Sequence, residues 1–117
     1  MSEITIYHNP RCTKSRKTLD LIKNNNIEPT VIFYLEKKIT YQELKNIILK
    51  LRISPRDLLR KGEVEYKENN LGNTNLSDDE IINFMINFPK LIERPIVIKG
   101  DEAIIGRPPE NVLKLII

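Results

Sequence analysis

The sequence predicts an α/β protein built on a small mixed β-sheet. Three observations support this: a strand–helix–strand pattern at the N-terminus, a wholly helical middle, and two short strands with a helix at the C-terminus. The chain has 117 residues, of which 40% are hydrophobic and 30% charged, which suits one globular domain with its own core. We therefore expect a single domain over residues 1–117, with a helical insertion at about residues 40–90.

The N-terminal part has the pattern of a βαβ unit. Residues 3–7, EITIY, alternate and are rich in β-branched side chains, which is typical of a strand. A helix should begin near Thr13 and end near the asparagines at 24–26. The apolar run from Val31 to Leu35 has the length of a second strand. Because a helix connects the two strands, they should be parallel.

Two helices in the middle begin with a capping box, in which Ser or Thr is followed three residues later by Glu. The pairs are Thr40 with Glu43 and Ser77 with Glu80. A short helix should start at Pro55, since proline is favoured at the first helical position. An Asn-rich loop precedes Ser77, and we expect no strand between residues 35 and 96. The residues expected to face inward on the first of these helices are Leu44, Ile47, Ile48 and Leu51.

The C-terminal part predicts a hairpin followed by a helix. Short strands at Ile96–Ile98 and Ala103–Ile105 flank a Gly-Asp turn, so this pair should be antiparallel. Pro109 fits the first turn of a final helix. The residues expected to face inward on that helix are Val112, Leu113 and Ile116.

Composition excludes several classes of function. The net charge of +3 is small and the basic residues are interleaved with acidic ones, which indicates solvated helix faces rather than a nucleic-acid surface. One Cys and one His cannot build a zinc site, so we expect no metal. No apolar run approaches the ~20 residues of a membrane span, and the N-terminus lacks a signal-peptide pattern. With no internal disulfide possible, we expect a cytoplasmic protein, with monomer as the default state.

The stretch HNPRCTKSR contains the only cysteine, Cys12, and the only histidine, His8. Cys12 follows a predicted strand and begins a helix, where unpaired N–H groups and a partial positive charge stabilise a thiolate. A lone Cys is usually a small buried hydrophobe, but here the neighbours are polar and include Arg11, Lys14 and Arg16. These cations favour a reactive thiolate. His8 either assists it or is simply a histidine at a strand end.

Ser15 stands where a Cys-x-x-Cys protein would carry its second thiol. Because Cys12 is the only cysteine, any oxidised adduct on its sulfur must be resolved by a thiol from another molecule. The sequence therefore predicts a one-thiol nucleophile.

Five motifs give the chain a specific resemblance. They are ITIYHNPRCTKSR, EPTVIFYLE, LLRK, ERPIVI and GRPPE, in this order and at these spacings over nearly the whole chain. With these motifs the sequence resembles the glutaredoxin-dependent arsenate reductase family. The resemblance implies a thioredoxin-like fold, with a β-α-β N-terminal unit, a helical insertion and a C-terminal β-β-α unit.

The resemblance also implies a chemistry. Cys12 would attack arsenate to form a thiol-arsenate adduct, glutathione would attack that adduct as co-substrate, and glutaredoxin would reduce the mixed disulfide. No bound cofactor is implied. His8 and Ser15 match residues that assist the thiol. A cis bond between Arg94 and Pro95 is also implied, since the proline before the third strand of this fold is characteristically cis. The matched oxyanion-binding arginines are Arg60, Arg94 and Arg107.

The arginines also suit an oxyanion on chemical grounds, because a guanidinium offers two donors in a fork. Arg52 and Arg56 lie close to Arg60 in the sequence and could serve in its place. Two alternative functions stay open. One is a glutathione-dependent thiol oxidoreductase without an arsenate role. The other is a redox-sensing regulator that binds RNA polymerase, although such sensors typically carry Cys-x-x-Cys and this chain has Ser15.

Overall fold

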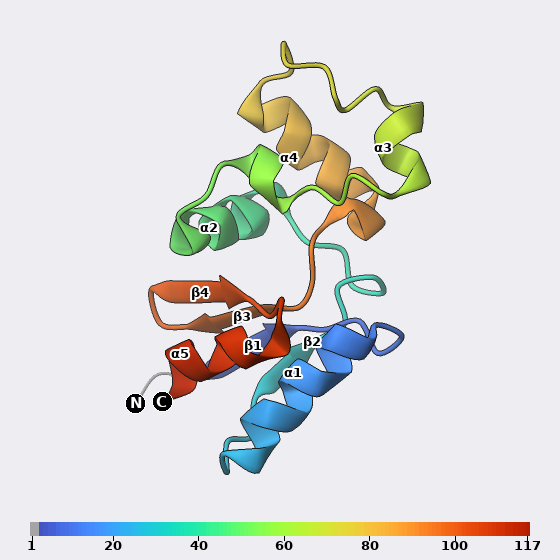
Figure 1. Ribbon diagram of the computed structural model, residues 1–117. Helices are drawn as coiled ribbons and strands as arrows, with labels where there is room; N and C mark the ends of the chain where they lie inside the picture. The colour runs from blue at the N-terminus through green and yellow to red at the C-terminus, as the bar shows by residue number, and fades with distance from the viewer. Residues whose placement is uncertain (1–2) are drawn as a thin grey trace. The chain divides into compact units, whose positions relative to one another are not determined.

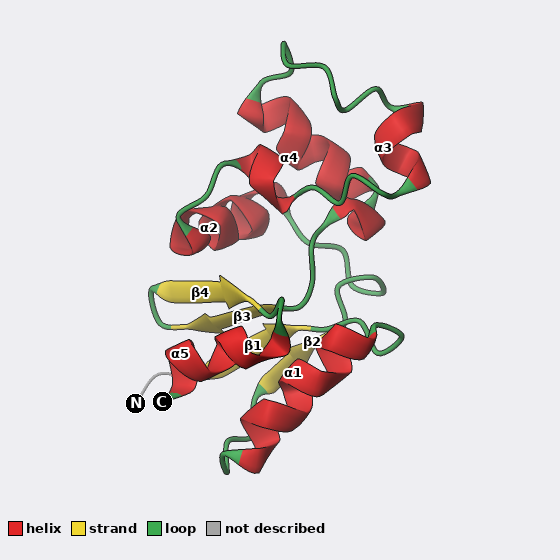
Figure 2. Cartoon of the chain, in the orientation of Figure 1, coloured by secondary structure: helices red, strands yellow, loops and turns green. Residues whose placement is uncertain are grey.

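The computed structural model describes residues 3–117, which form two compact units. The first, called the sheet unit, comprises the chain up to Lys37 together with Arg94–Ile117. The second, called the helical unit, is Lys38–Glu93. Figure 2 shows the strands in the sheet unit, while the described residues of the helical unit form helices and loops. Lys38–Glu93 overlaps the stretch of about residues 40–90 for which the sequence predicts helices, while the description of this stretch as an insertion in a single domain stays a prediction.

The sheet has four strands in the order β2-β1-β3-β4. β1 pairs in parallel with β2 and antiparallel with β3, which pairs antiparallel with β4. The βαβ unit and the C-terminal hairpin predicted from the sequence are therefore confirmed. The strands are β1 at Ile4–Tyr7, β2 at Thr30–Ile32, β3 at Ile96–Lys99 and β4 at Glu102–Ile105.

Two helices pack on one face of this sheet, as Figure 1 shows. They are α1, Thr13–Asn24, and α5, Leu113–Ile116, which continues a 3-10 turn at Pro109–Val112. The core between them and the sheet is entirely aliphatic, and burial of such side chains stabilises the fold by about 1.5–3 kcal/mol each. Its buried members are Ile4, Ile6, Ile22, Val97, Val112 and Leu115.

Two details of the sheet unit differ from the sequence prediction. β2 ends at Ile32, because the chain then turns: the N–H groups of Glu36 and Lys37 both donate to the carbonyl of Phe33, at 3.0 and 2.9 Å. The apolar run therefore leaves the sheet before its end. In the final helix Leu115 is buried rather than Leu113, because the 3-10 turn rotates the following residues relative to a continuous α-helix.

The helical unit contains three α-helices: α2, Tyr41–Leu51; α3, Val64–Glu68; and α4, Asp78–Asn87. Both predicted capping boxes are formed, on α2 and α4. The Tyr41 hydroxyl donates to Asp79 and so joins the first turns of these two helices. α3 is not predicted from the sequence, because it is a single turn without buried residues and so short a helix has no hydrophobic face to detect.

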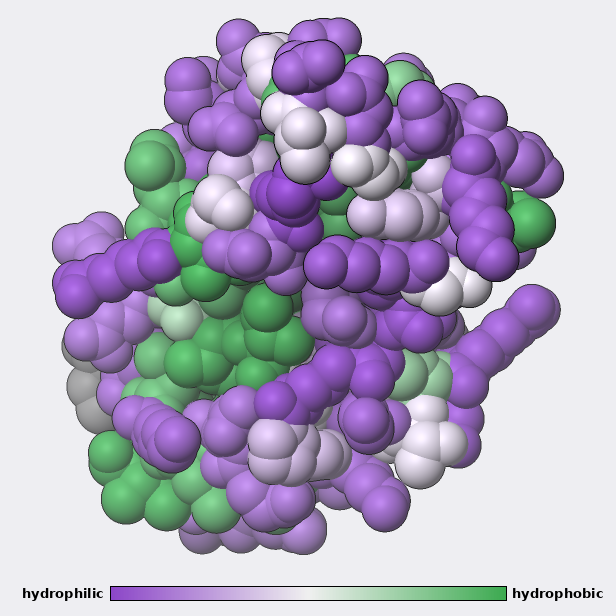
Figure 3. All heavy atoms as spheres, turned by 45° about the horizontal axis from the view of Figure 1, so that its top comes forward, coloured by the Kyte–Doolittle hydropathy of each residue, from purple (hydrophilic) through white to green (hydrophobic). Residues whose placement is uncertain are grey.

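Hydrophobic side chains also reach the surface. Figure 3 shows a face that is mostly hydrophilic, with hydrophobic side chains gathered in places. The largest exposed ones include Phe33 and Leu35, with 42% and 40% of their surface accessible. Within residues 3–117, no helix is both long enough and apolar enough to cross a membrane.

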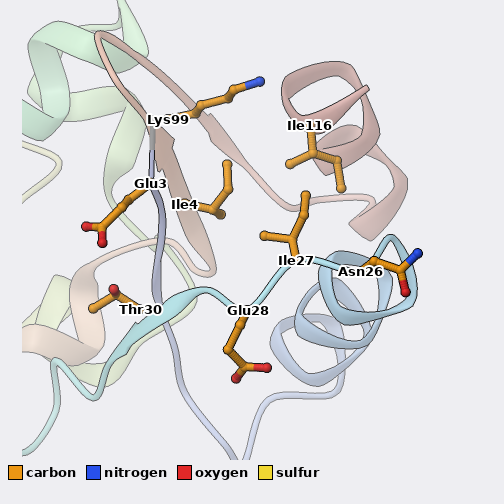
Figure 4. Close-up of a pocket in the computed structure, with 8 residues that line it drawn as sticks. All are labelled: Glu3, Ile4, Asn26, Ile27, Glu28, Thr30, Lys99 and Ile116. Atoms are coloured by element: carbon orange, nitrogen blue, oxygen red, sulfur yellow. The ribbon is translucent and has the colours of Figure 1, made fainter. Parts of the chain in front are cut away.

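A pocket of about 510 Å³ lies at the N-terminal end of β1. It is lined by aliphatic side chains together with charged and polar ones (Figure 4). Because Cys12 follows the other end of β1, this pocket is at the opposite edge of the sheet from the reactive residue predicted from the sequence. Its lining residues are Glu3, Ile4, Asn26, Ile27, Glu28, Thr30, Lys99 and Ile116.

The α2 capping box allows a first test. Thr40→Ala removes the side chain that accepts the Glu43 N–H at 3.1 Å, so we expect the free energy of unfolding to fall by about 1 kcal/mol. Urea denaturation of wild type and variant measures this. Thr74→Ala, in an exposed loop, is the matched control and should change stability by less than about 0.5 kcal/mol. Equal effects of the two substitutions would contradict the capping role.

Candidate active site

Strand register brings three distant segments together at one edge of the sheet. Tyr7, the last residue of β1, lies opposite Ile96, the first residue of β3, and Ile96 lies opposite Ile105, the last residue of β4. The residues that follow β1, precede β3 and follow β4 therefore emerge side by side. These segments carry Cys12, Arg94 and Arg107 respectively.

Cys12 is the N-cap of α1, with extended backbone angles, and its side chain is partly exposed. Its own N–H donates to the Asn9 carbonyl at 3.0 Å, which closes the loop between β1 and the helix. The backbone N–H groups of Lys14 and Ser15, in the first turn, favour the charged form of the sulfur and lower the pKa of Cys12. Orphan helix N–H groups thus supply donors to the thiolate, as the sequence position predicts.

Two guanidinium groups complete the surroundings of the sulfur. Arg107 Nη2 lies 3.6 Å from Cys12 Sγ, and the Arg94 side chain also bonds to Cys12. The two arginines are joined, because Arg107 Nε donates to the Arg94 carbonyl at 2.8 Å. Of the residues predicted to bind an oxyanion, the structure places these two at the sulfur.

The pKa of the Cys12 thiol is lowered by this environment. Burial alone would raise the pKa, and it is the largest single influence. The Ser15 N–H, the Arg94 side chain, the Lys14 N–H and the positive charge of Arg107 together outweigh it. The fraction of thiolate at neutral pH is therefore greater than for a free cysteine, and the thiolate is the nucleophilic form.

His8 adds no positive charge beside the thiol at neutral pH. Burial, followed by repulsion from Arg16 and Lys23, lowers the pKa of His8, so its ring is uncharged at neutral pH. His8 Nδ1 lies 2.6 Å from the Oγ of Ser15, which also accepts the Asn9 N–H at 3.1 Å. We therefore assign the Ser15 hydroxyl as the donor to Nδ1. The pair orders the loop around Cys12 rather than adding charge.

The third predicted arginine, Arg60, belongs to the helical unit. There it forms ion pairs with Glu93 at 2.9 Å and Glu63 at 3.3 Å. Arg56, a proposed substitute for it, is a loop anchor: its guanidinium donates to the carbonyls of Leu71 and Asn73 at 2.6 and 2.9 Å. A role of Arg60 in anion binding stays a prediction.

Comparisons with known proteins agree with this geometry. The sequence matches the ArsC family profile over residues 7–115. This chain belongs to the ArsC family. It is 47% identical to the uncharacterized protein YfgD of Escherichia coli K12, over 97% of both chains. It is 46% identical to an arsenate reductase of Haemophilus influenzae, over 97% of this chain and 98% of that one.

A solved structure, the arsenate reductase from Vibrio cholerae, is 48% identical, matches with a TM-score of 0.94 and covers 97% of both chains. The fold of this ArsC family member is therefore thioredoxin-like, as the resemblance implies. The Arg94–Pro95 bond is cis, and so is Arg107–Pro108. The sequence analysis predicts the first of these cis bonds but not the second.

Sequence reasoning missed the residues that hold Arg107 in place. The Asn111 side-chain amide donates to the Arg107 carbonyl at 2.9 Å and lies 3.4 Å from the Ile105 carbonyl. Gly106 packs so tightly that a Cβ would stand 2.5 Å from Thr18 Oγ1 and 2.8 Å from Pro95 Cγ. The GRPPE motif contains this glycine, but only the folded chain shows what it faces.

The close packing at Gly106 leads to a second prediction. Gly106→Ala forces the new methyl group against α1 and the cis-proline segment, so the free energy of unfolding should fall by about 1–3 kcal/mol. Urea denaturation measures the change. Gly62→Ala is the matched control, because its Cβ would meet nothing within 4 Å, and it should be neutral or slightly stabilising. A neutral Gly106→Ala would contradict the packing.

A third prediction concerns the thiolate. Arg107→Gln removes a positive charge beside the sulfur, so the pKa of Cys12 should rise and alkylation by iodoacetamide near neutral pH should slow. The pH dependence of the alkylation rate gives the pKa. Lys17→Gln removes one exposed charge from α1 and is the control that should leave the profile unchanged.

The lowered pKa of Cys12 also makes the free energy of unfolding depend on pH. Since the folded pKa of Cys12 lies below its unfolded value, the thiolate contributes stability above the unfolded pKa and loses it as pH falls through the folded pKa. The stability difference between wild type and Cys12→Ser should therefore grow as pH rises through this window. A difference that stays constant across it would contradict a lowered pKa.

Proposed function

We propose that this protein reduces arsenate to arsenite through an adduct on Cys12. The observation that supports this best is the Cys12 sulfur at the N-cap of a helix, beside the guanidinium groups of Arg94 and Arg107. Such donors suit a tetrahedral oxyanion, which must be held next to the sulfur that attacks it. Relatives at about 46–47% identity carry the name arsenate reductase.

The first step forms a bond between sulfur and arsenic. Cys12 Sγ attacks the arsenic of arsenate, and one arsenate oxygen leaves as water after taking up protons. Arg94 and Arg107 neutralise charge on the remaining oxygens, and the Lys14 and Ser15 amides lie where a further oxygen could bind. Arsenic stays in the +5 state in this adduct.

The second step is the reduction, and it requires a thiol from outside the chain. Cys12 is the only cysteine, so the second thiol must come from another molecule, and we propose glutathione. Its thiolate attacks the sulfur of the adduct, a disulfide forms between Cys12 and glutathione, and the electron pair of the sulfur–arsenic bond leaves with arsenic as arsenite. The two thiols supply both electrons. Glutaredoxin then takes the glutathionyl group and regenerates the Cys12 thiolate.

His8 and Ser15 serve as positioning residues in this scheme. Ser15 is fully buried and joins the neutral His8 ring to the Asn9 amide, so it fixes the loop from which Cys12 projects. Ser15 also presents its own backbone N–H to the sulfur. Arg60 is proposed as a further arsenate-binding arginine.

A fifth prediction tests the reaction itself. Wild type should form arsenite from arsenate when glutathione, glutaredoxin and a system that re-reduces glutathione are supplied. Cys12→Ser should give no turnover, because a hydroxyl does not ionise at neutral pH. Arg107→Gln should lower kcat/KM for arsenate by roughly 10²–10³, as for loss of one oxyanion donor, while Lys17→Gln keeps wild-type rates.

The same assay separates the alternatives. In one outcome the protein forms no arsenite and still reduces a glutathione mixed disulfide in a reaction that depends on Cys12. That result would favour a thiol oxidoreductase without an arsenate role. Replacing glutathione by thioredoxin as the only reductant tests the thiol partner. Full turnover under that condition would contradict the glutathione step and leave the arsenate step standing.

A further inference from the structure

A second, smaller pocket of about 210 Å³ adjoins the Cys12 loop. One wall comes from the loop after β1, residues 8–11, and the other from the loop after β2, with Phe33, Leu35 and Glu36. Arg11 in this wall is the direct chain neighbour of Cys12, so their Cα atoms are about 3.8 Å apart. The roles proposed above for the reaction do not use these side chains, apart from His8.

The two walls are held against each other by the sheet. Tyr7 lies opposite Ile32 in the parallel pair, and the His8 N–H donates to the Ile32 carbonyl at 2.9 Å. The chain therefore leaves β1 and β2 side by side. The His8 and Phe33 rings then meet edge to face, with centroids 5.9 Å apart. The pocket is thus a built feature of the fold and lies on the β2 side of the reactive loop.

Its walls combine apolar and charged groups. Phe33 and Leu35 are 42% and 40% exposed, although they belong to the apolar run that the sequence predicts as a strand. Arg11 and Glu36 are exposed and bring one positive and one negative charge. The Lys14 and Ser15 amides, Arg94 and Arg107 account for the lowered pKa of Cys12, so the charge of Arg11 is not required there.

We propose that this pocket binds the γ-glutamyl end of glutathione, with Arg11 on its α-carboxylate, Glu36 on its α-ammonium group, and Phe33 and Leu35 against its methylene groups. This inference rests on the proposed function, since it names where that reaction's co-substrate sits. A pair of opposite charges matches a zwitterion, whereas a simple oxyanion would be repelled by Glu36.

The size of the pocket agrees with a part of the tripeptide. Pockets for drug-sized ligands are about 300–1,000 Å³, so 210 Å³ suits the γ-glutamyl portion alone. The cysteinyl sulfur of glutathione would then lie outside the pocket, toward Cys12. Its glycine end would extend into solvent.

The test uses a reaction that needs no arsenate. The Cys12 thiolate attacks a disulfide, forms a mixed disulfide and releases one thiolate. One S–S bond forms as another breaks, so no other oxidant or reductant is needed. Rates are compared for glutathione disulfide and for bis(2-hydroxyethyl) disulfide, which lacks the γ-glutamyl group. Wild type should react faster with glutathione disulfide. The double variant Arg11→Gln/Glu36→Gln should lose about tenfold of that rate, in line with charged hydrogen bonds, and keep its rate with the hydroxyethyl compound.

Lys17→Gln is the matched control and should behave as wild type with both disulfides. Binding is also followed by amide NMR shifts on adding S-methylglutathione, which cannot react, and these should centre on residues 8–11 and 33–36. Equal rates of wild type and double variant with glutathione disulfide would overturn the proposal. Equal slowing of the double variant with both disulfides would also overturn it, since that result indicates a changed reactivity of the Cys12 thiolate. NMR shifts centred on the pocket at Glu3 and Lys99 would overturn it too. A clear glutathione preference without arsenate turnover would overturn only the proposed function.

Discussion

The register between β1, β3 and β4 is the constraint on which the site depends. It aligns Tyr7, Ile96 and Ile105 across three strands, so the chain segments next to them must meet at one edge of the sheet. A slip of one residue would turn every side chain to the other face, and the aliphatic core under α1 and α5 prevents that slip. The same hydrophobic contacts that stabilise the fold therefore also bring Arg107 to within hydrogen-bonding reach of Cys12.

At the sulfur, two opposing effects are balanced. Partial burial disfavours a charged thiolate, while amides and guanidinium groups favour it, and the second effect is the larger. Burial also has a use here, because donors act more strongly where water is partly excluded. His8 contributes no charge to this balance. Its neutral ring accepts a hydrogen bond from the Ser15 hydroxyl. The cationic side chains that stabilise the thiolate are those of Arg94 and Arg107.

Several of the features predicted correctly from the sequence are local ones. Helix starts depend on a few adjacent residues, so Cys12 at a helix start and the Thr40 and Ser77 capping boxes could be read directly. The features that were missed depend on residues far apart. Asn111 looks like an ordinary helix residue until its amide is seen on the Arg107 carbonyl, and the need for glycine at 106 appears only with Thr18 and Pro95 beside it. The neutral state of His8 likewise depends on burial that no local pattern reveals.

The second strand is shorter than the sequence predicts, and this difference bears on function. The apolar run VIFYL predicts a strand, yet only its first part pairs with β1, and Phe33 and Leu35 remain partly exposed. About two-fifths of the surface of each of these apolar side chains stays in contact with water, which is unfavourable for that area. Phe33 and Leu35 lie beside the loop that precedes Cys12, the one cysteine of the sequence, and binding of a second thiol there would cover them. A one-thiol enzyme cannot complete its own cycle, so it must hold the second thiol close enough to react, and apolar contact next to Cys12 is a direct way to do so.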